Sequence, residues 1–273
     1  MAINPHVELI SIGEELLIGK IANTNAQFLA RRIVSLGGRV RRITVVGDDV
    51  DVIAETIRES LSRKPNLIIT TGGLGPTFDD KTLEGIARAL GRSLVLDDEA
   101  LKMVKERYAH LSSVRGQTYE LTPARLKMAK IPEGSSALHN PVGTAPGVLI
   151  KLEGCFLVAL PGVPSEMEAI FEESIAPIIR NLSKSVFHEK SLRVEGIFES
   201  DLAPLIDVAM RENATVYVKS HPRMEEGKGY IELHLTTSSE TLEKAKESIE
   251  RTAERLRELI QQRGGSILPQ GTP

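Results

Sequence analysis

Strand-like and helix-like segments alternate three times within the first ninety residues, and this alternation constrains the fold more than any other feature of the sequence. Apolar strand segments occupy 7–12, 40–46 and 67–71, and each precedes a segment with apolar residues at helical spacing. A helix between two strands returns the chain to the same edge of the sheet, so successive strands run parallel. The pattern predicts an α/β fold in which a mostly parallel sheet lies between two helical layers.

The rest of the chain completes one domain and predicts a second. A hairpin turn at 153–154 and a helix that starts with the capping-box pattern at 165–168 complete a first domain over 1–185. Residues 186–263 show a strand-helix-strand-strand-helix pattern, which predicts a smaller α+β domain. Residues 264–273 are expected to form a flexible tail.

Composition excludes several classes of function. The chain has 273 residues, a formal net charge of -3 and only 4% aromatic residues, so nucleic acid is not an expected partner. No apolar run approaches the roughly 20 residues that span a bilayer, and no secretory signal is visible at the N-terminus. Cys155 is the single cysteine and lies in an apolar run, so we expect a core residue in a cytoplasmic protein that is not bound to a membrane.

Each of the three early strands ends in glycine and acidic residues. The sequence is G-E-E at 13–15, G-D-D at 47–49, and G-G-L-G at 72–75 followed by D-D at 79–80. The carboxyl ends of parallel strands meet at one edge of the sheet, where ligands bind. Glycine-rich turns expose N–H groups that hold phosphates, but carboxylates repel phosphates, so a divalent cation such as Mg²⁺ is expected between them. The convergence predicts a metal-assisted site for a phosphate-containing small molecule.

Each acidic turn also has a purely structural explanation. Asp48 or Asp49 could serve simply as the N-cap of the helix that begins near residue 50, without any part in ligand binding. Asp79 or Asp80 could likewise serve simply as the N-cap of the third helix. The turn at 161–164 could simply connect a strand to the next helix, although the start of that helix could bind an anion. Glu14 or Glu15 could be a turn residue whose side chain is simply exposed to solvent.

Familiar nucleotide motifs do not match. Gly13 and Gly19 are one residue too far apart for a Walker A loop, and Lys20 is followed by isoleucine. The segment 73–78 begins like a dinucleotide fingerprint but lacks its last glycine. Neither a standard P-loop NTPase nor an ordinary NAD enzyme fits this sequence.

Several motifs together resemble the CinA family. They are T-G-G-L-G-P-T-F-D-D at 71–80, G-E-E-L-L-I-G at 13–19, N-T-N-A at 23–26, V-G-D at 46–48, N-P-V-G-T-A-P-G at 140–147 and L-P-G-V-P-S-E-M at 160–167. The resemblance implies the molybdopterin-binding fold shared by MogA, MoaB and part of MoeA, and a KH-like second domain. It further implies a dimeric, metal-dependent ADP-ribose pyrophosphatase that uses Mg²⁺, Mn²⁺ or Co²⁺ and releases AMP and ribose 5-phosphate.

The same resemblance assigns catalytic residues, because Asp48, Asp80 and Glu15 correspond to family positions, while Glu14 stands where threonine is common. Together with the convergence of the acidic turns, this leads us to expect Asp48, Asp79 and Asp80 as metal ligands. Which carboxylate is base and which is ligand stays open. The implied substrate-binding residues are Asn25, Thr71, Gly72, Gly73, Leu74, Gly75, Thr77, Gly143, Pro161, Gly162, Pro164 and Ser165.

Two departures from the family pattern limit the expected activities. Full-length CinA proteins carry a further C-terminal domain that deamidates nicotinamide mononucleotide, and this chain ends before it, so that activity is not expected. The second domain lacks a G-x-x-G loop, so RNA binding is not expected either.

Two alternative functions remain open at this stage. The site could bind molybdopterin or adenylylate it, as MogA-like proteins do, or the chain could be a non-catalytic nucleotide-binding module whose second domain forms a dimer. Basic residues around the predicted loop of the second domain could then reach a phosphate across the dimer, or they could simply be solvated. They are Lys219, His221, Arg223 and Lys228.

Overall fold

The chain forms two compact units in the computed structural model, which describes residues 4–115, 120–225 and 228–268. Residues 4–34 and 38–182 make the first unit. The second unit contains 35–37 and the described chain from Ser183 onwards. None of the helices in the described residues is long and apolar enough to cross a membrane.

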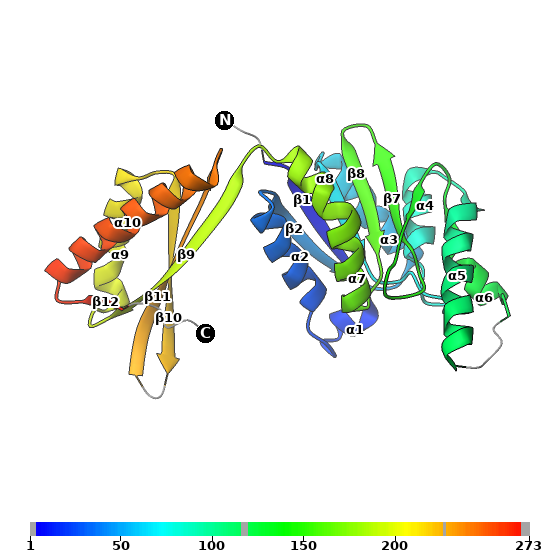
Figure 1. Ribbon diagram of the computed structural model, residues 1–273, viewed down its shortest axis with the longest axis horizontal. Coiled ribbons are helices and arrows are strands. Elements are labelled where there is room, and N and C mark those ends of the chain that lie inside the picture. The colour runs from blue at the N-terminus through cyan, green and yellow to red at the C-terminus, as the bar shows by residue number, and fades with distance from the viewer. Residues whose placement is uncertain (1–3, 116–119, 226–227, 269–273) are drawn as a thin grey trace. The chain divides into compact units, whose positions relative to one another are not determined.

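A six-stranded sheet forms the centre of the first unit, in the order β2-β1-β3-β8-β7-β6 (Figure 1). The first four of these strands run parallel, and the last two are antiparallel to their neighbours, which confirms the predicted mostly parallel sheet. β7 and β8 are joined by the predicted two-residue turn, where Gly154 has a φ of +73°. The strands are β1 (His6–Ile12), β2 (Arg39–Val46), β3 (Leu67–Thr71), β6 (Ser136–Leu138), β7 (Gly147–Leu152) and β8 (Cys155–Leu160).

Helices cover both faces of this sheet, as the alternating pattern predicts (Figure 1). On one face, Ile10 and Ile68 of the strands are buried together with Ile53 and Ile57 of α3. The helices of this layer are α3 (Val50–Ser62) and α4 (Thr82–Leu90). On the other face lie α2 (Thr24–Ser35) and the helical segment 164–182, which meet where the rings of Phe28 and Phe171 pack edge to face.

Further elements of the first unit lie outside the six-stranded sheet. They are α1 (Glu14–Leu17), β4 (Leu94–Leu96), α5 (Asp98–Arg115), α6 (Pro123–Lys127) and β5 (Lys130–Pro132). The Thr122 side chain accepts a hydrogen bond from the backbone N–H of Arg125 and so caps α6, with Pro123 at the first helical position.

The helical segment after β8 differs from the sequence prediction in two ways. α7 (Pro164–Ile170) has Val163 as its N-cap and no side-chain cap, so the predicted Ser165 capping box is wrong. Pro164, whose φ suits the first helical position, starts the helix one residue earlier. The segment then passes through a π-helical turn, η1 (Phe171–Ile175), before α8 (Ala176–Leu182), so it is not one regular α-helix.

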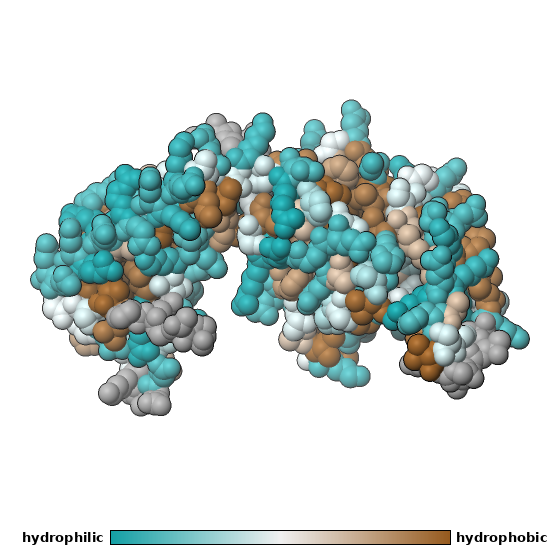
Figure 2. Space-filling view, viewed as in Figure 1, coloured by the Kyte–Doolittle hydropathy of each residue, from teal (hydrophilic) through white to brown (hydrophobic). Residues whose placement is uncertain are grey.

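The second unit is an antiparallel sheet, in the order β10-β11-β9-β12, with two helices packed against it. Apolar side chains of α10 such as Ile249 and Leu256 lie in its core, and Figure 2 shows the outer surface of that helix as largely hydrophilic. The elements are β9 (Val186–Glu195), α9 (Glu199–Glu212), β10 (Val216–Glu225), β11 (Lys228–Ser239), α10 (Leu242–Gln262) and β12 (Ser266–Leu268).

Two expectations for the second unit are wrong. The predicted flexible tail contains β12, whose three residues pair with β9, and residues 269–273 lie outside the described chain. The predicted basic loop is largely strand, because Lys219, His221 and Arg223 belong to β10 and pair with β11. Cross-strand ion pairs, such as Arg223 with Glu232, explain why the charged residues extend the hairpin.

Candidate functional site

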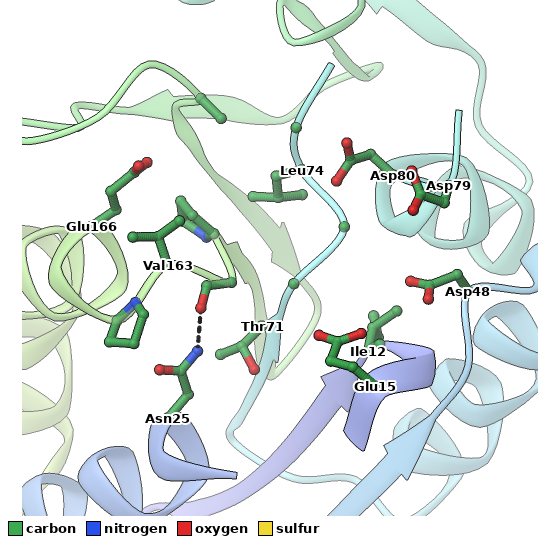
Figure 3. A pocket seen from close by; sticks show the side chains of 18 of the residues that line it. Ile12, Glu15, Asn25, Asp48, Thr71, Leu74, Asp79, Asp80, Val163 and Glu166 are labelled. Atoms are coloured by element: carbon green, nitrogen blue, oxygen red, sulfur yellow. Dashed lines mark hydrogen bonds between the residues drawn. The ribbon is translucent and has the colours of Figure 1, made fainter. Parts of the chain in front are cut away.

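A cleft of about 590 Å³ lies at the carboxyl ends of β1, β2, β3 and β8 (Figure 3). This is the sheet edge at which the three acidic turns are predicted to converge. Most of the predicted site residues line the cleft: Glu15, Asn25, Asp48, Thr71, Gly72, Gly73, Leu74, Gly75, Asp79, Asp80, Pro161, Gly162 and Pro164. Topology therefore gathers residues that are up to 149 positions apart in the sequence, from Glu15 to Pro164.

Three predicted substrate-binding residues do not line this cleft: Thr77, Gly143 and Ser165. Thr77 holds the aspartate turn, as described below, and Gly143 packs against the Glu166 carboxylate. Ser165 is exposed in the first turn of α7. Thr77 and Gly143 therefore help to shape the cleft wall, although they do not line the cleft.

The glycine-rich loop after β3 has a shape that only glycine can supply. Gly72 has a φ of +101°, and a Cβ there would lie 2.2 Å from the backbone oxygen of Ile12. Gly73 has a φ of +64°, and a Cβ would lie 2.4 Å from the hydroxyl oxygen of Thr82. That hydroxyl donates a 2.8 Å hydrogen bond to the carbonyl of Gly72, so the start of α4 holds the loop against the sheet.

Backbone N–H groups of this loop are available to a ligand. Gly72 donates to the carbonyl of Leu160, whereas no described residue accepts from the N–H of Gly73, Leu74 or Gly75. Consecutive free N–H groups at a bend form a concave anion-binding surface. The loop can therefore hold phosphate oxygens without a lysine or arginine.

The aspartates after β2 have separate roles. Asp49 is the N-cap of α3, since its side chain accepts from the N–H groups of Asp51 and Val52. Asp48 does not cap this helix. Its carboxylate accepts a 2.9 Å hydrogen bond from the N–H of Glu14 and lines the cleft. The structural explanation therefore holds for Asp49 and fails for Asp48.

Negative charges accumulate around Asp48. Burial raises the pKa of the Asp48 carboxyl, and the charges of Glu15, Asp79 and Asp80 raise it further, against the opposing hydrogen bond from Glu14. Figure 3 shows these four side chains grouped at one side of the cleft. A cation would relieve this repulsion.

The aspartates after the glycine loop are held by a tight turn. The N–H and the hydroxyl of Thr77 lie 2.8 and 2.6 Å from Asp80 Oδ2, and the hydroxyl also contacts Asp79. The α4 helix has Lys81 as its N-cap without a side-chain bond, so neither aspartate caps it. Hydrogen bonds from the Thr77 hydroxyl and from the backbone N–H of Asp79 itself lower the pKa of Asp79, and the charges of Lys127 and Lys81 add to this effect.

The carboxylates of the cleft fit a cation only if phosphate oxygens of the ligand and water molecules complete its coordination. Within the described residues, no three His, Cys, Asp or Glu side chains form a group that could hold a metal ion. Mg²⁺, however, is commonly held by one or two carboxylates together with waters and substrate phosphates. Asp48 and Asp80 can supply such carboxylates beside a loop that can hold the phosphates.

The opposite wall of the cleft is formed by α2 and the turn before α7. Asn25 Nδ2 donates a 2.8 Å hydrogen bond to the carbonyl of Gly162, drawn as a dashed line in Figure 3. Asn25 Oδ1 is buried and has no hydrogen-bond partner among the described residues. An unsatisfied buried acceptor costs about 1–3 kcal/mol.

Glu166 was not among the predicted site residues, although it belongs to the motif L-P-G-V-P-S-E-M at 160–167. Its carboxylate lines the cleft and accepts a 2.7 Å hydrogen bond from Asn140 Nδ2. Tyr108 of α5 and Thr144 also line the cleft and were not predicted. Tyr108 lies under the Arg125 guanidinium, 4.4 Å from the ring centroid, a contact without a sequence pattern of its own.

The family of the first unit follows from comparison with known proteins. Residues 8–181 match the family described as "probable molybdopterin binding domain". The chain belongs to this family. The matched range covers the six-stranded sheet except for the first two residues of β1, and it contains every residue that lines the cleft.

Individual relatives match nearly the whole chain or about two thirds of it. A protein of Pyrobaculum aerophilum is 45% identical over 259 residues, which is 94% of this chain and 95% of that protein. A protein of Aeropyrum pernix is 44% identical over 266 residues, 97% of each. The crystal structure of CinA from Thermoplasma acidophilum has a TM-score of 0.58 and 42% identity, over 64% of this chain and 98% of that one. The expected CinA-like, molybdopterin-binding fold is thereby confirmed.

Proposed function

We propose that this chain is a metal-dependent pyrophosphohydrolase that cleaves ADP-ribose to AMP and ribose 5-phosphate. The proposal is supported chiefly by one observation: a glycine loop, three of whose N–H groups have no acceptor among the described residues, lies in the same cleft as Glu15, Asp48, Asp79 and Asp80. A diphosphate satisfies the loop, and a cation between the diphosphate and the carboxylates satisfies both charges. A site for an uncharged ligand would need neither feature.

The residues of the cleft have distinct tasks in this proposal. The N–H groups of Gly73 to Gly75 bind and orient the diphosphate, while Asp48, Asp79 and Asp80 are candidate ligands of Mg²⁺, Mn²⁺ or Co²⁺. Such a cation supplies charge neutralisation and activation of a water. One carboxylate, with Glu15 among the candidates, takes the proton of the attacking water. The water oxygen forms a new P–O bond as the bridging P–O bond breaks, which yields the two monophosphates.

A metal-by-substrate assay tests the proposal. The protein is incubated with ADP-ribose and each of the three cations, and the AMP that is released is measured. Other nucleoside diphosphate compounds are tested as substrates in the same way, so that their rates of hydrolysis can be compared with that of ADP-ribose. AMP release above the metal-only control supports the proposal, and no AMP with any of the cations rejects it.

Asp80→Ala tests the role of the aspartate turn. We expect turnover to fall at least about a hundredfold, as when a group that stabilises the transition state is removed. Asp98→Ala, which removes an exposed carboxylate from the first turn of α5, is the matched control. Unchanged turnover of a folded Asp80→Ala protein would contradict the role of Asp80.

Molybdopterin binding, or its adenylylation, is the second candidate, and the description of the family favours it. Tight binding of the pterin by a protein that leaves ADP-ribose intact would support this alternative. Binding of a nucleotide without any product, under every cation, would instead support a non-catalytic nucleotide-binding module.

The second unit gives further proposals about assembly. We propose that it is a KH-like domain that forms a homodimer, and that the protein acts in the cytoplasm on a small nucleotide and not on nucleic acid. Its antiparallel sheet with two helices on one side is consistent with such a domain. Light scattering after gel filtration of the whole chain tests the dimer, and a monomeric mass would reject it.

A further inference from the structure

Glu166 places a negative charge in the cleft on the wall opposite the aspartates. Figure 3 shows Glu166 on one side and Asp48, Asp79 and Asp80 on the other. The Glu166 side chain is half-buried, and no described Lys, Arg or His forms an ion pair with it. A half-buried carboxylate without a counter-ion is costly unless it has another partner.

The neighbouring loop fixes the orientation of this carboxylate. Asn140 is only 8% exposed, and all of its hydrogen-bonding positions are used. Its Oδ1 accepts from the N–H groups of Val142 and Gly143, at 3.1 and 2.7 Å. Its Nδ2 donates to the carbonyl of Ala145 and to Glu166 Oε2, both at 2.7 Å. Glu166 Oε1 has no partner among the described residues and can accept from a ligand.

Gly143 makes this arrangement possible. A Cβ at this position would lie 1.9 Å from both Cδ and Oε2 of Glu166. The close approach lets the 140–145 loop support the carboxylate from behind. Glu166 is therefore pre-oriented and its acceptor geometry is set before a ligand arrives.

The charge of Glu166 limits what can bind beside it. A carboxylate repels phosphate oxygens and accepts hydrogen bonds from hydroxyl groups, as acidic residues do with the ribose of dinucleotides. We infer that Glu166 is a specificity-determining residue that accepts hydrogen bonds from the hydroxyl groups of a ribose in the ligand. The inference rests on the proposed function, in which the glycine loop holds a diphosphate. ADP-ribose has a ribose on each side of its diphosphate, so one ribose faces Glu166 in either orientation.

A binding cycle tests this inference without relying on catalysis. Wild type, Glu166→Gln and Glu168→Gln are titrated calorimetrically with ADP-ribose and with two deoxy analogues, each lacking hydroxyl groups on one ribose. Ca²⁺ replaces the activating cation to keep the ligands intact, and product analysis after each titration checks this. Glu168 lies on the same helix and does not line the cleft, so its variant controls for the loss of charge.

The expected result is a coupling between the side chain and one ribose. Glu166→Gln should bind ADP-ribose about tenfold more weakly, which is the lower end of the range for a hydrogen bond to a charged group. This loss should vanish for one of the two analogues, and Glu168→Gln should behave as wild type.

Three outcomes separate the inference from the proposed function. A loss of the same size for all three ligands, or no loss for any of them, overturns the inference. The expected coupling without any AMP release under activating cations supports the inference and rejects hydrolysis. No detectable binding of ADP-ribose by wild type overturns both.

Discussion

Gly143→Ala should displace the Glu166 carboxylate without changing its charge. The new Cβ would lie 1.9 Å from Glu166 Cδ, and the flexible end of that side chain is what must move. The backbone at 143 is not in the left-handed region, so alanine adds no conformational strain there. The change breaks the 2.7 Å hydrogen bond between Asn140 Nδ2 and Glu166 Oε2, and the half-buried carboxylate can exchange it for water. Hydrogen bonds to charged groups contribute about 1.5–3 kcal/mol, so we expect a loss of about 1–2 kcal/mol in the free energy of unfolding.

Urea unfolding monitored by circular dichroism measures this loss, with Gly229→Ala as control because nothing lies within 4 Å of a Cβ at that position. The same variant should weaken ADP-ribose binding to a similar extent as Glu166→Gln. A stability within about 0.3 kcal/mol of wild type, together with unchanged binding, would refute the reasoning that the loop orients Glu166.

Two further predictions concern side chains away from the cleft. Glu8→Gln should lower the free energy of unfolding by about 2 kcal/mol at pH 7, because the buried carboxylate accepts 2.7–2.8 Å hydrogen bonds from Arg63 and Ser60. Burial acts to raise the pKa of Glu8, but these bonds outweigh it and lower the pKa. The stabilisation should therefore be complete above the ordinary carboxyl range and disappear as the pH falls below about 4, where wild type and variant should converge. Equal stability at pH 7, with exposed Glu59→Gln as control, would contradict this. Burial raises the pKa of the Cys155 thiol to about 11, so a thiol reagent at pH 8 should label the native protein slowly and the urea-unfolded protein quickly. Rapid native labelling would show that the thiol is accessible.

The fold of the first unit was predictable because its signals are local and mutually consistent. Each early strand segment is apolar, each helix follows at the expected spacing, and the connection rule for parallel strands leaves few topologies. The cleft was predictable for the same reason, since glycines and acidic residues follow three strands that must end at one edge. Local pattern alone could not separate Asp48 from Asp49, because either can cap a helix, and Asp48 was selected only through the family resemblance. Only the hydrogen bonds to Glu14, Asp51 and Val52 distinguish them.

The errors arose where two local signals compete or where a contact is distant in sequence. Ser165 has a capping-box pattern, but Pro164 begins the helix first. The segment 266–268 lies among glycine, proline and polar residues typical of a frayed terminus, and only its pairing with β9 shows that it is a strand. Glu166 was missed because its orientation depends on Asn140, 26 positions earlier, in a loop without regular structure. No spacing rule connects such a pair.

The parallel sheet order assigns stability and recognition to different residues. The buried apolar side chains of β1, β3 and β8 lie along the strands, whereas most cleft-lining residues lie in the turns that follow the strands or on the helices α2, α5 and α7. On the opposite edge, the short connections 36–38 and 63–66 lead from a helix into the next strand, and Arg63 also holds the carboxylate of Glu8. Substitutions in the turns can therefore change ligand preference at little cost to folding, except at Gly72 and Gly73, where the backbone itself forms part of the wall. A chain of this design can acquire new substrates by variation of four turns while its core remains unchanged.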